Sequence, residues 1–90
     1  MTMLKDKTVI VTGAAGGIGR AIAEEAGHAG ARLALVDSDA TRLEQTAMEI
    51  RANGVAVLPL VVDMTDRLLW QGSIDDIATE FGSIDVMVNN

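Results

Sequence analysis

Three glycines directly after an apolar run are the residues of this chain best suited to bind a ligand. The run Thr8–Thr12 is followed by Gly13, Gly17 and Gly19, in the spacing Gly-x-x-x-Gly-x-Gly. Where a parallel strand leads into a helix, a glycine turn lets backbone N–H groups approach a phosphate. Gly13 permits the turn, Gly17 the close approach and Gly19 the tight packing of helix on strand. A plain strand-to-helix turn is the alternative, but the position of all three glycines favours a dinucleotide pyrophosphate.

An acidic residue ends the second apolar run of the sequence. Asp37 follows the glycine loop by roughly 20 residues, the distance at which a carboxylate accepts hydrogen bonds from an adenosine ribose. The same carboxylate would repel a 2′-phosphate, by about 4 kcal/mol for unit charges about 4 Å apart at an effective dielectric near 20. Gly16 and Ser38 bring no positive charge to the loop or to the position after Asp37. The sequence therefore predicts NAD in preference to NADP, with a helix-capping role as the alternative for Asp37.

The third and fourth apolar runs also end in polar residues. A carboxylate at Asp63 would be able to accept from the adenine amino group while Met64 contacts the ring, and a cap or turn is the alternative. Asn89 and Asn90 follow the last run, where an asparagine can bridge neighbouring strands while it faces a cofactor. A simple turn at the strand end explains the two asparagines equally well.

Short apolar runs alternate with amphipathic stretches along the whole chain. The predicted strands are Lys7–Thr12, Arg32–Val36, Val55–Val62 and Ile84–Val88. The predicted helices are Gly17–His28, Ala40–Ala52 and a third from a cap at Asp66 to about Phe81. This β-α-β-α-β-α-β order predicts an α/β fold, the first half of a Rossmann-type doubly wound parallel sheet with strand order 3-2-1-4. Pro59 agrees with this order, because proline is tolerated best in an edge strand.

Helical spacing identifies the residues that should face the sheet. The predicted apolar faces are Ile18, Ile22 and Ala26 in the first helix, and Leu43, Ala47 and Ile50 in the second. Ser38 or Asp39 is predicted to cap the second helix. Trp70 is predicted to pack in the core beneath the third helix.

The composition excludes several classes of protein. A net charge of −6 with scattered charges argues against nucleic acid as a partner. The chain has no cysteine for a disulfide, and His28, its single histidine, cannot build a zinc site alone. No segment has the length of a transmembrane helix, and the first seven residues lack an apolar signal core. We therefore expect no membrane association and, by default, a cytoplasmic protein.

Together these motifs resemble the classical short-chain dehydrogenase/reductase family. The pattern consists of Thr12-Gly13-x-x-x-Gly17-Ile18-Gly19, Asp37, Asp63-Met64-Thr65-Asp66 and Asn89-Asn90. The resemblance implies that the pyrophosphate is held by Thr12, Gly13, Ala15, Gly16, Gly17, Ile18 and Gly19. It also implies that Asp37 selects NAD, that Asp63 and Met64 contact adenine, that Asn90 lies against the cofactor ribose and that Asn89 stabilises the central sheet.

The resemblance further implies an activity for the parent protein. Members of the family transfer a hydride between a nicotinamide cofactor and an alcohol or ketone. Their serine, Tyr-x-x-x-Lys pair and helical asparagine lie downstream of the position of Asn90, and this chain has no tyrosine. No catalytic residue is therefore predicted, and the 90 residues alone are expected to be inactive.

The whole chain is predicted to be one unit. Residues 1–90 are expected to be the N-terminal dinucleotide-binding portion of a single Rossmann domain, cut at the end of the fourth strand. The complete enzyme is expected to form a homo-oligomer. The alternative is a non-catalytic dinucleotide-binding or interaction module.

Overall fold

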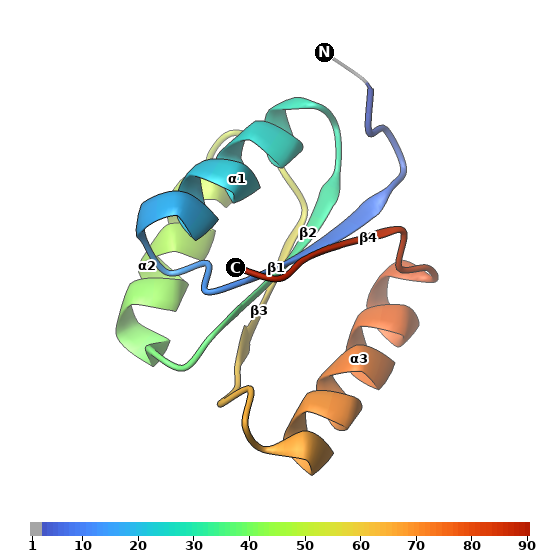
Figure 1. Ribbon diagram of the computed structural model, residues 1–90. Helices are drawn as coiled ribbons and strands as arrows, with labels where there is room; N and C mark the ends of the chain where they lie inside the picture. The colour runs from blue at the N-terminus through green and yellow to red at the C-terminus, as the bar shows by residue number, and fades with distance from the viewer. Residues whose placement is uncertain (1–2) are drawn as a thin grey trace.

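The computed structural model describes residues 3–90 as a parallel sheet with helices on both faces (Figure 1). The strands are β1 (Thr8–Thr12), β2 (Arg32–Asp37), β3 (Val57–Val61) and β4 (Val86–Val88). The helices are α1 (Gly17–His28), α2 (Ala40–Arg51) and α3 (Arg67–Phe81). The strand order is β3-β2-β1-β4 and every pair is parallel, which confirms the predicted Rossmann-type order 3-2-1-4. Met1 and Thr2, part of the N-terminal segment judged to lack a signal core, lie outside the described residues.

Alternate residues of the central strands enter two separate apolar cores. Val9, Val11, Leu33 and Leu35 pack in the core that also holds residues of α1 and α2. Ile10, Ala34 and Val36 point to the opposite face, where Ile77 and Trp70 of α3 cover them. Because successive side chains of a strand point to opposite faces, both faces of β1 and β2 are buried. This explains why these strands read as continuous apolar runs, as parallel strands do. Trp70 packs against this core, as predicted, but is only partly buried.

Side-chain caps begin two of the helices. Asp39, rather than Ser38, caps α2 by accepting a hydrogen bond from the Arg42 amide at 3.1 Å. Asp66 caps α3 in the same way, accepting from the Leu69 amide at 3.1 Å. Each such cap contributes about 1 kcal/mol. Within residues 3–90 no helix is long and apolar enough to cross a membrane.

The face of α1 that packs on the sheet differs from the prediction. Its buried residues are Gly19, Ala23, Ala26 and Gly27. Of the predicted face, Ala26 is buried and Ile22 packs partly buried against the core, whereas Ile18 does not. Ile18 is 70% exposed and, with the outer side of the half-buried Ile22, lines a shallow apolar hollow beside β4. Small residues are required beneath α1 because it lies very close to the sheet. A Cβ at Gly27, for example, would lie 3.5 Å from Leu33 of β2 and 3.2 Å from Val55, which precedes β3.

A side chain replaces backbone pairing where β4 begins. The predicted strand starts at Ile84, but β4 starts at Val86, because the carboxylate of Asp85 accepts a hydrogen bond from the Thr8 amide at 2.8 Å. The Asp85 amide in turn donates to the Thr8 carbonyl at 3.0 Å. The bond from Thr8 is the main reason why the pKa of Asp85 lies below its ordinary value of 3.8. Asp85 therefore anchors β4 beside β1.

We expect Asp85→Ala to lower the thermal stability of the chain at neutral pH and to lose this effect in acid. Because the carboxyl pKa is depressed in the folded state, its contribution is present above the unfolded value of 3.8 and is lost as the pH falls through the lower folded value. Thermal unfolding followed by circular dichroism between roughly pH 7 and pH 2 measures the difference in Tm. Asp75→Ala, which removes an exposed carboxylate of α3, is the control. A Tm difference that does not change with pH would contradict this role.

Candidate functional site

A hollow of about 330 Å³ opens where β1, β2 and β3 end and the chain leaves β4. The carboxyl ends of parallel strands lie together at one end of the sheet, and ligands of open α/β sheets bind in the crevice outside them. The hollow brings together six of the predicted site residues: Thr12, Gly13, Asp37, Asp63, Met64 and Asn90. Val36, Ser38, Val62 and Asn89 complete its lining.

The glycine loop has the geometry that its spacing predicts. Gly13 and Gly17 have φ values of +63° and +59°, in the left-handed region that favours glycine. A Cβ on Gly19 would overlap the carbonyl oxygen of Gly13, so α1 can lie this close to the loop only with glycine there. Around Gly17 the space that a Cβ would fill is open. The loop thus leaves room for a ligand at the start of α1.

No side chain caps the N-terminus of α1, in contrast to α2 and α3. Its N-cap residue is Gly16, and its first turn contains no acidic residue among the described positions. The first amides of a helix have no acceptor within the helix, and the helix dipole places partial positive charge at this end. An anion in front of Gly17 and Ile18 would accept hydrogen bonds from these amides and would be attracted by the partial positive charge.

The peptide group of Ala15 is held from two sides. Asp37 Oδ2 accepts from the Ala15 amide at 3.0 Å, and the Thr46 hydroxyl donates to the Ala15 carbonyl at 3.2 Å. Asp37 Oδ1 also accepts from the Asp39 amide at 3.0 Å, so Asp37 shapes the turn before α2 as well. Each carboxylate oxygen has a further lone pair for a ribose hydroxyl.

The role of Thr46 was missed from the sequence. The signal was a polar residue on the buried face of α2, directly beside Ala47 and one turn after Leu43. Its hydroxyl fixes the loop through a contact between residues 31 apart in the sequence. That contact is set by tertiary packing, so helical periodicity shows only that Thr46 is buried.

Thr12 joins the loop to the end of β4. Its hydroxyl oxygen accepts a hydrogen bond from the Asn90 amide at 3.0 Å. As a donor, the same hydroxyl lies 3.4 Å from the Val88 carbonyl oxygen and 3.3 Å from Asn89 Oδ1. The Asn90 side chain donates to the Gly13 carbonyl at 3.3 Å. The two asparagines therefore bridge neighbouring strands. Thr12 is buried and its hydroxyl is engaged by the chain, so it positions the loop.

Asp63 forms a local turn at the rim of the hollow. Its Oδ1 accepts from the Thr65 hydroxyl at 2.7 Å and from the Thr65 amide at 2.9 Å. These bonds, the side-chain bond above all, hold the pKa of Asp63 below its ordinary value. The carboxylate is therefore ionised at neutral pH, and Met64 beside it is partly exposed to the hollow.

The remaining predicted residues do not line the hollow. Ala15 is buried, and the Arg42 side chain covers Gly16, where a Cβ would overlap the guanidinium group. Ile18 points to the apolar hollow beside β4, together with Ile22 and Val88. Arg42 is a second residue near the site that sequence reasoning missed.

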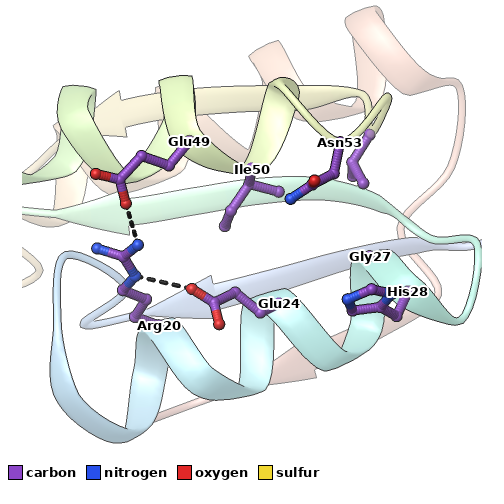
Figure 2. Close-up of a pocket in the computed structure, with 8 residues that line it drawn as sticks. Arg20, Glu24, Gly27, His28, Glu49, Ile50 and Asn53 are labelled. Atoms are coloured by element: carbon purple, nitrogen blue, oxygen red, sulfur yellow. Dashed lines mark hydrogen bonds and ion pairs between the residues drawn. The ribbon is translucent and has the colours of Figure 1, made fainter.

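A separate hollow of about 350 Å³ lies between α1 and α2 (Figure 2). Arg20 reaches from α1 toward two carboxylates, with its Nε 2.8 Å from Glu24 and an Nη bonded to Glu49. None of the predicted site residues lines it. Exposed ion pairs of this kind add little stability. Within residues 3–90 no group of three His, Cys, Asp or Glu is placed to hold a metal ion.

Comparison with known proteins agrees with this architecture. The family model for short chain dehydrogenases matches residues 7–90. The chain is 42% identical over 89 residues to the short chain dehydrogenase/reductase dpchG of Colletotrichum higginsianum, covering 99% of this chain and 33% of that protein. The chain thus spans about a third of the length of this curated relative.

Two solved structures share the fold of this chain. The citronellol catabolism dehydrogenase AtuB of Pseudomonas aeruginosa superposes with a TM-score of 0.95 at 36% identity, over 99% of this chain and 37% of that one. A short chain dehydrogenase/reductase of Burkholderia phymatum, solved in complex with NAD, superposes with a TM-score of 0.91 at 31% identity. The match covers 97% of this chain and 31% of that one. With its glycine loop, its 3-2-1-4 sheet and a family match across residues 7–90, this chain belongs to the short chain dehydrogenase family of oxidoreductases.

Proposed function

We propose that this chain is the NAD-binding portion of an enzyme that transfers a hydride between a nicotinamide cofactor and an alcohol or ketone. The observation that carries the proposal is the position of the Asp37 carboxylate. It lies in the same hollow as Gly13, Asp63 and Met64 and is bonded to the amide of Ala15 in the glycine loop. A carboxylate and a glycine loop side by side suit the ribose and the pyrophosphate of one dinucleotide.

Each part of the adenosine half has a matching group in the hollow. The ribose hydroxyls donate to Asp37, which has spare lone pairs, and the adenine amino group donates to the ionised Asp63. Met64 contacts the adenine ring, and Asn90 lies against the cofactor ribose. The pyrophosphate lies before the uncapped start of α1, where Gly17 leaves open space.

The bound nicotinamide supplies the hydride chemistry. Residues of this chain hold and orient the dinucleotide, and we assign none of them a catalytic role. Thr12 and Asn89 act by positioning, since they hold the loop against the end of β4. The alcohol or ketone substrate and a homo-oligomeric state belong to the complete enzyme in this proposal.

Calorimetric titration of the 90-residue chain with NAD and with NADP tests the proposal. We expect saturable binding of NAD, and binding of NADP that is weaker by about tenfold or more, because a 2′-phosphate brings negative charge beside Asp37. The Asp37→Ala chain should bind NAD more weakly and lose this preference, whereas Asp76→Ala, which removes an exposed carboxylate of α3, should match the parent chain.

Two results would contradict the proposal in different ways. Failure of a chain with a folded circular dichroism spectrum to bind either dinucleotide would overturn NAD binding by these 90 residues alone. Equal binding of both dinucleotides would retain the site but overturn the preference for NAD.

A further inference from the structure

We propose that Arg42 is a specificity-determining residue of the dinucleotide site, which attracts a 2′-phosphate and so limits the preference for NAD that Asp37 creates. The inference rests on the function proposed above. It concerns a cation that the sequence places five residues after Asp37, in the first turn of α2. Only the folded structure brings its side chain to the glycine loop.

The Arg42 guanidinium lies against the backbone of Gly16. A Cβ built on Gly16 would overlap Nη2 and would lie 3.1 Å from Cζ and 3.8 Å from Nη1. The preceding residue, Ala15, donates its amide hydrogen to Asp37. A guanidinium and a carboxylate therefore lie at two successive residues of one loop. Arg42 lies outside the hollow that Asp37 lines, and in this proposal the 2′ substituent of a ribose bonded to Asp37 lies at the rim between the two groups.

The charge of Arg42 is not used elsewhere in the fold. Among residues 3–90, no carboxylate lies within ion-pair distance of its guanidinium, whereas Arg20 and Arg51 both pair with glutamates. The side chain is exposed, and its guanidinium donates no hydrogen bond to the described part of the chain. All five of its N–H donors are thus available to a ligand.

The position of Arg42 also runs against the electrostatics of its own helix. The first turn of a helix carries partial positive charge and favours acidic residues. A cation there gains nothing from the helix, so helix stability does not explain it. The Asp39 carboxylate already caps the start of α2, so an anion beside Arg42 would be attracted by the guanidinium alone.

The two charges act in opposite directions on NADP. The 2′-phosphate carries between one and two negative charges at neutral pH, so Asp37 repels it while Arg42 attracts it. The ribose of NAD has no charge at this position, so the affinity for NAD should depend far more on Asp37 than on Arg42. Removal of Asp37 would leave Arg42 unopposed, so NADP should bind more tightly and the preference for NAD should be lost.

A double-mutant cycle on the 90-residue chain tests this division of roles. Arg42→Gln, Asp37→Ala and the combined variant are titrated with NAD and NADP beside the parent chain. Glutamine keeps much of the side-chain length and has a helix propensity close to that of arginine, so the fold should be retained. Lys5→Gln is the charge-matched control. Lys5 is exposed and packs beside Gly30, where β1 and β2 begin, at the end of the strands away from the hollow.

We expect Arg42→Gln to weaken NADP about tenfold and to change NAD by less than about twofold. Asp37→Ala should strengthen NADP, and the combined variant should lose most of that gain. Equal weakening of both dinucleotides by Arg42→Gln would overturn the inference while leaving the proposed function intact. The same holds if the combined variant binds NADP as tightly as Asp37→Ala alone. If the folded parent chain binds neither dinucleotide, the proposed function fails and this inference fails with it.

Discussion

Replacing Gly19 with alanine should destabilise the chain by about 3 kcal/mol or more and abolish dinucleotide binding. A single Cβ at this position would overlap the Gly13 carbonyl oxygen and lie 2.8 Å from the Asn90 side chain. Backbone cannot give way as a flexible side chain does, so α1 would have to move away from β1. That movement opens the turn on which the pyrophosphate site depends.

The same substitution at Gly72 provides a matched control for Gly19. Gly72 lies within α3 and has nothing within 4 Å of the place that a Cβ would occupy. Gly72→Ala should therefore stabilise the chain by about 1 kcal/mol, the usual gain of alanine over glycine in a helix. Urea unfolding followed by the fluorescence of Trp70 measures both variants, and calorimetry measures NAD binding. A Gly19→Ala chain as stable as the parent would contradict the close contact.

Ile77→Ala should cost about 2–5 kcal/mol, a large share of the roughly 5–13 kcal/mol expected for a chain of this size. Within α3, all of which the structure describes, only Ile77 and Ser73 are buried, and Ile77 is 0% exposed. It packs in the cluster of Ile10, Ala34 and Val36 on one face of the sheet. Its loss would leave a cavity where α3 joins the fold.

Leu68→Ala in the same helix is the control for Ile77→Ala. Leu68 is 87% exposed, so its truncation should change the free energy of unfolding by less than about 0.5 kcal/mol. Urea unfolding of the two variants under one condition gives the comparison. Equal effects at the two positions would show that α3 does not depend on Ile77 for its attachment.

The order and direction of the elements could be predicted from local signals in the sequence. Apolar runs separated by helix-length stretches require parallel crossovers, and the single Pro59 indicated an edge strand. Caps at Asp39 and Asp66 and the stop at Gly82 gave the helix ends to within a residue or two. These features are local, so no knowledge of distant contacts was needed.

The face of α1 could not be predicted in this way. Hydropathy favours Ile18, which is exposed, but the closeness of α1 to the sheet selects Gly19, Ala23 and Gly27 by size. Shape thus overrides hydrophobicity where a helix starts in a glycine loop. The sequence alone does not give the distance between a helix and a sheet.

The candidate site was only partly predictable for a related reason. Asp37 and Asp63 were identified because each lies at the end of a predicted strand, and Asn90 through the family resemblance; the hollow does bring them together. Thr46 and Arg42 come from the side of α2, and their contacts with the loop depend on how that helix packs. Residues that act from a helix face leave no fixed spacing in the sequence.

The two edges of the sheet are not equivalent, because Pro59 lies in the middle of β3. The Val62 amide donates to Asp37, and amides alternate in direction along a parallel strand, so the nitrogen of Pro59 points away from β2. The outer side of β3 therefore lacks a donor at its centre. β4 has β1 on one side only, and its backbone and partly exposed Val86 and Met87 have no such block. A further strand would therefore find a complete row of backbone donors beside β4, but an interrupted row beside β3.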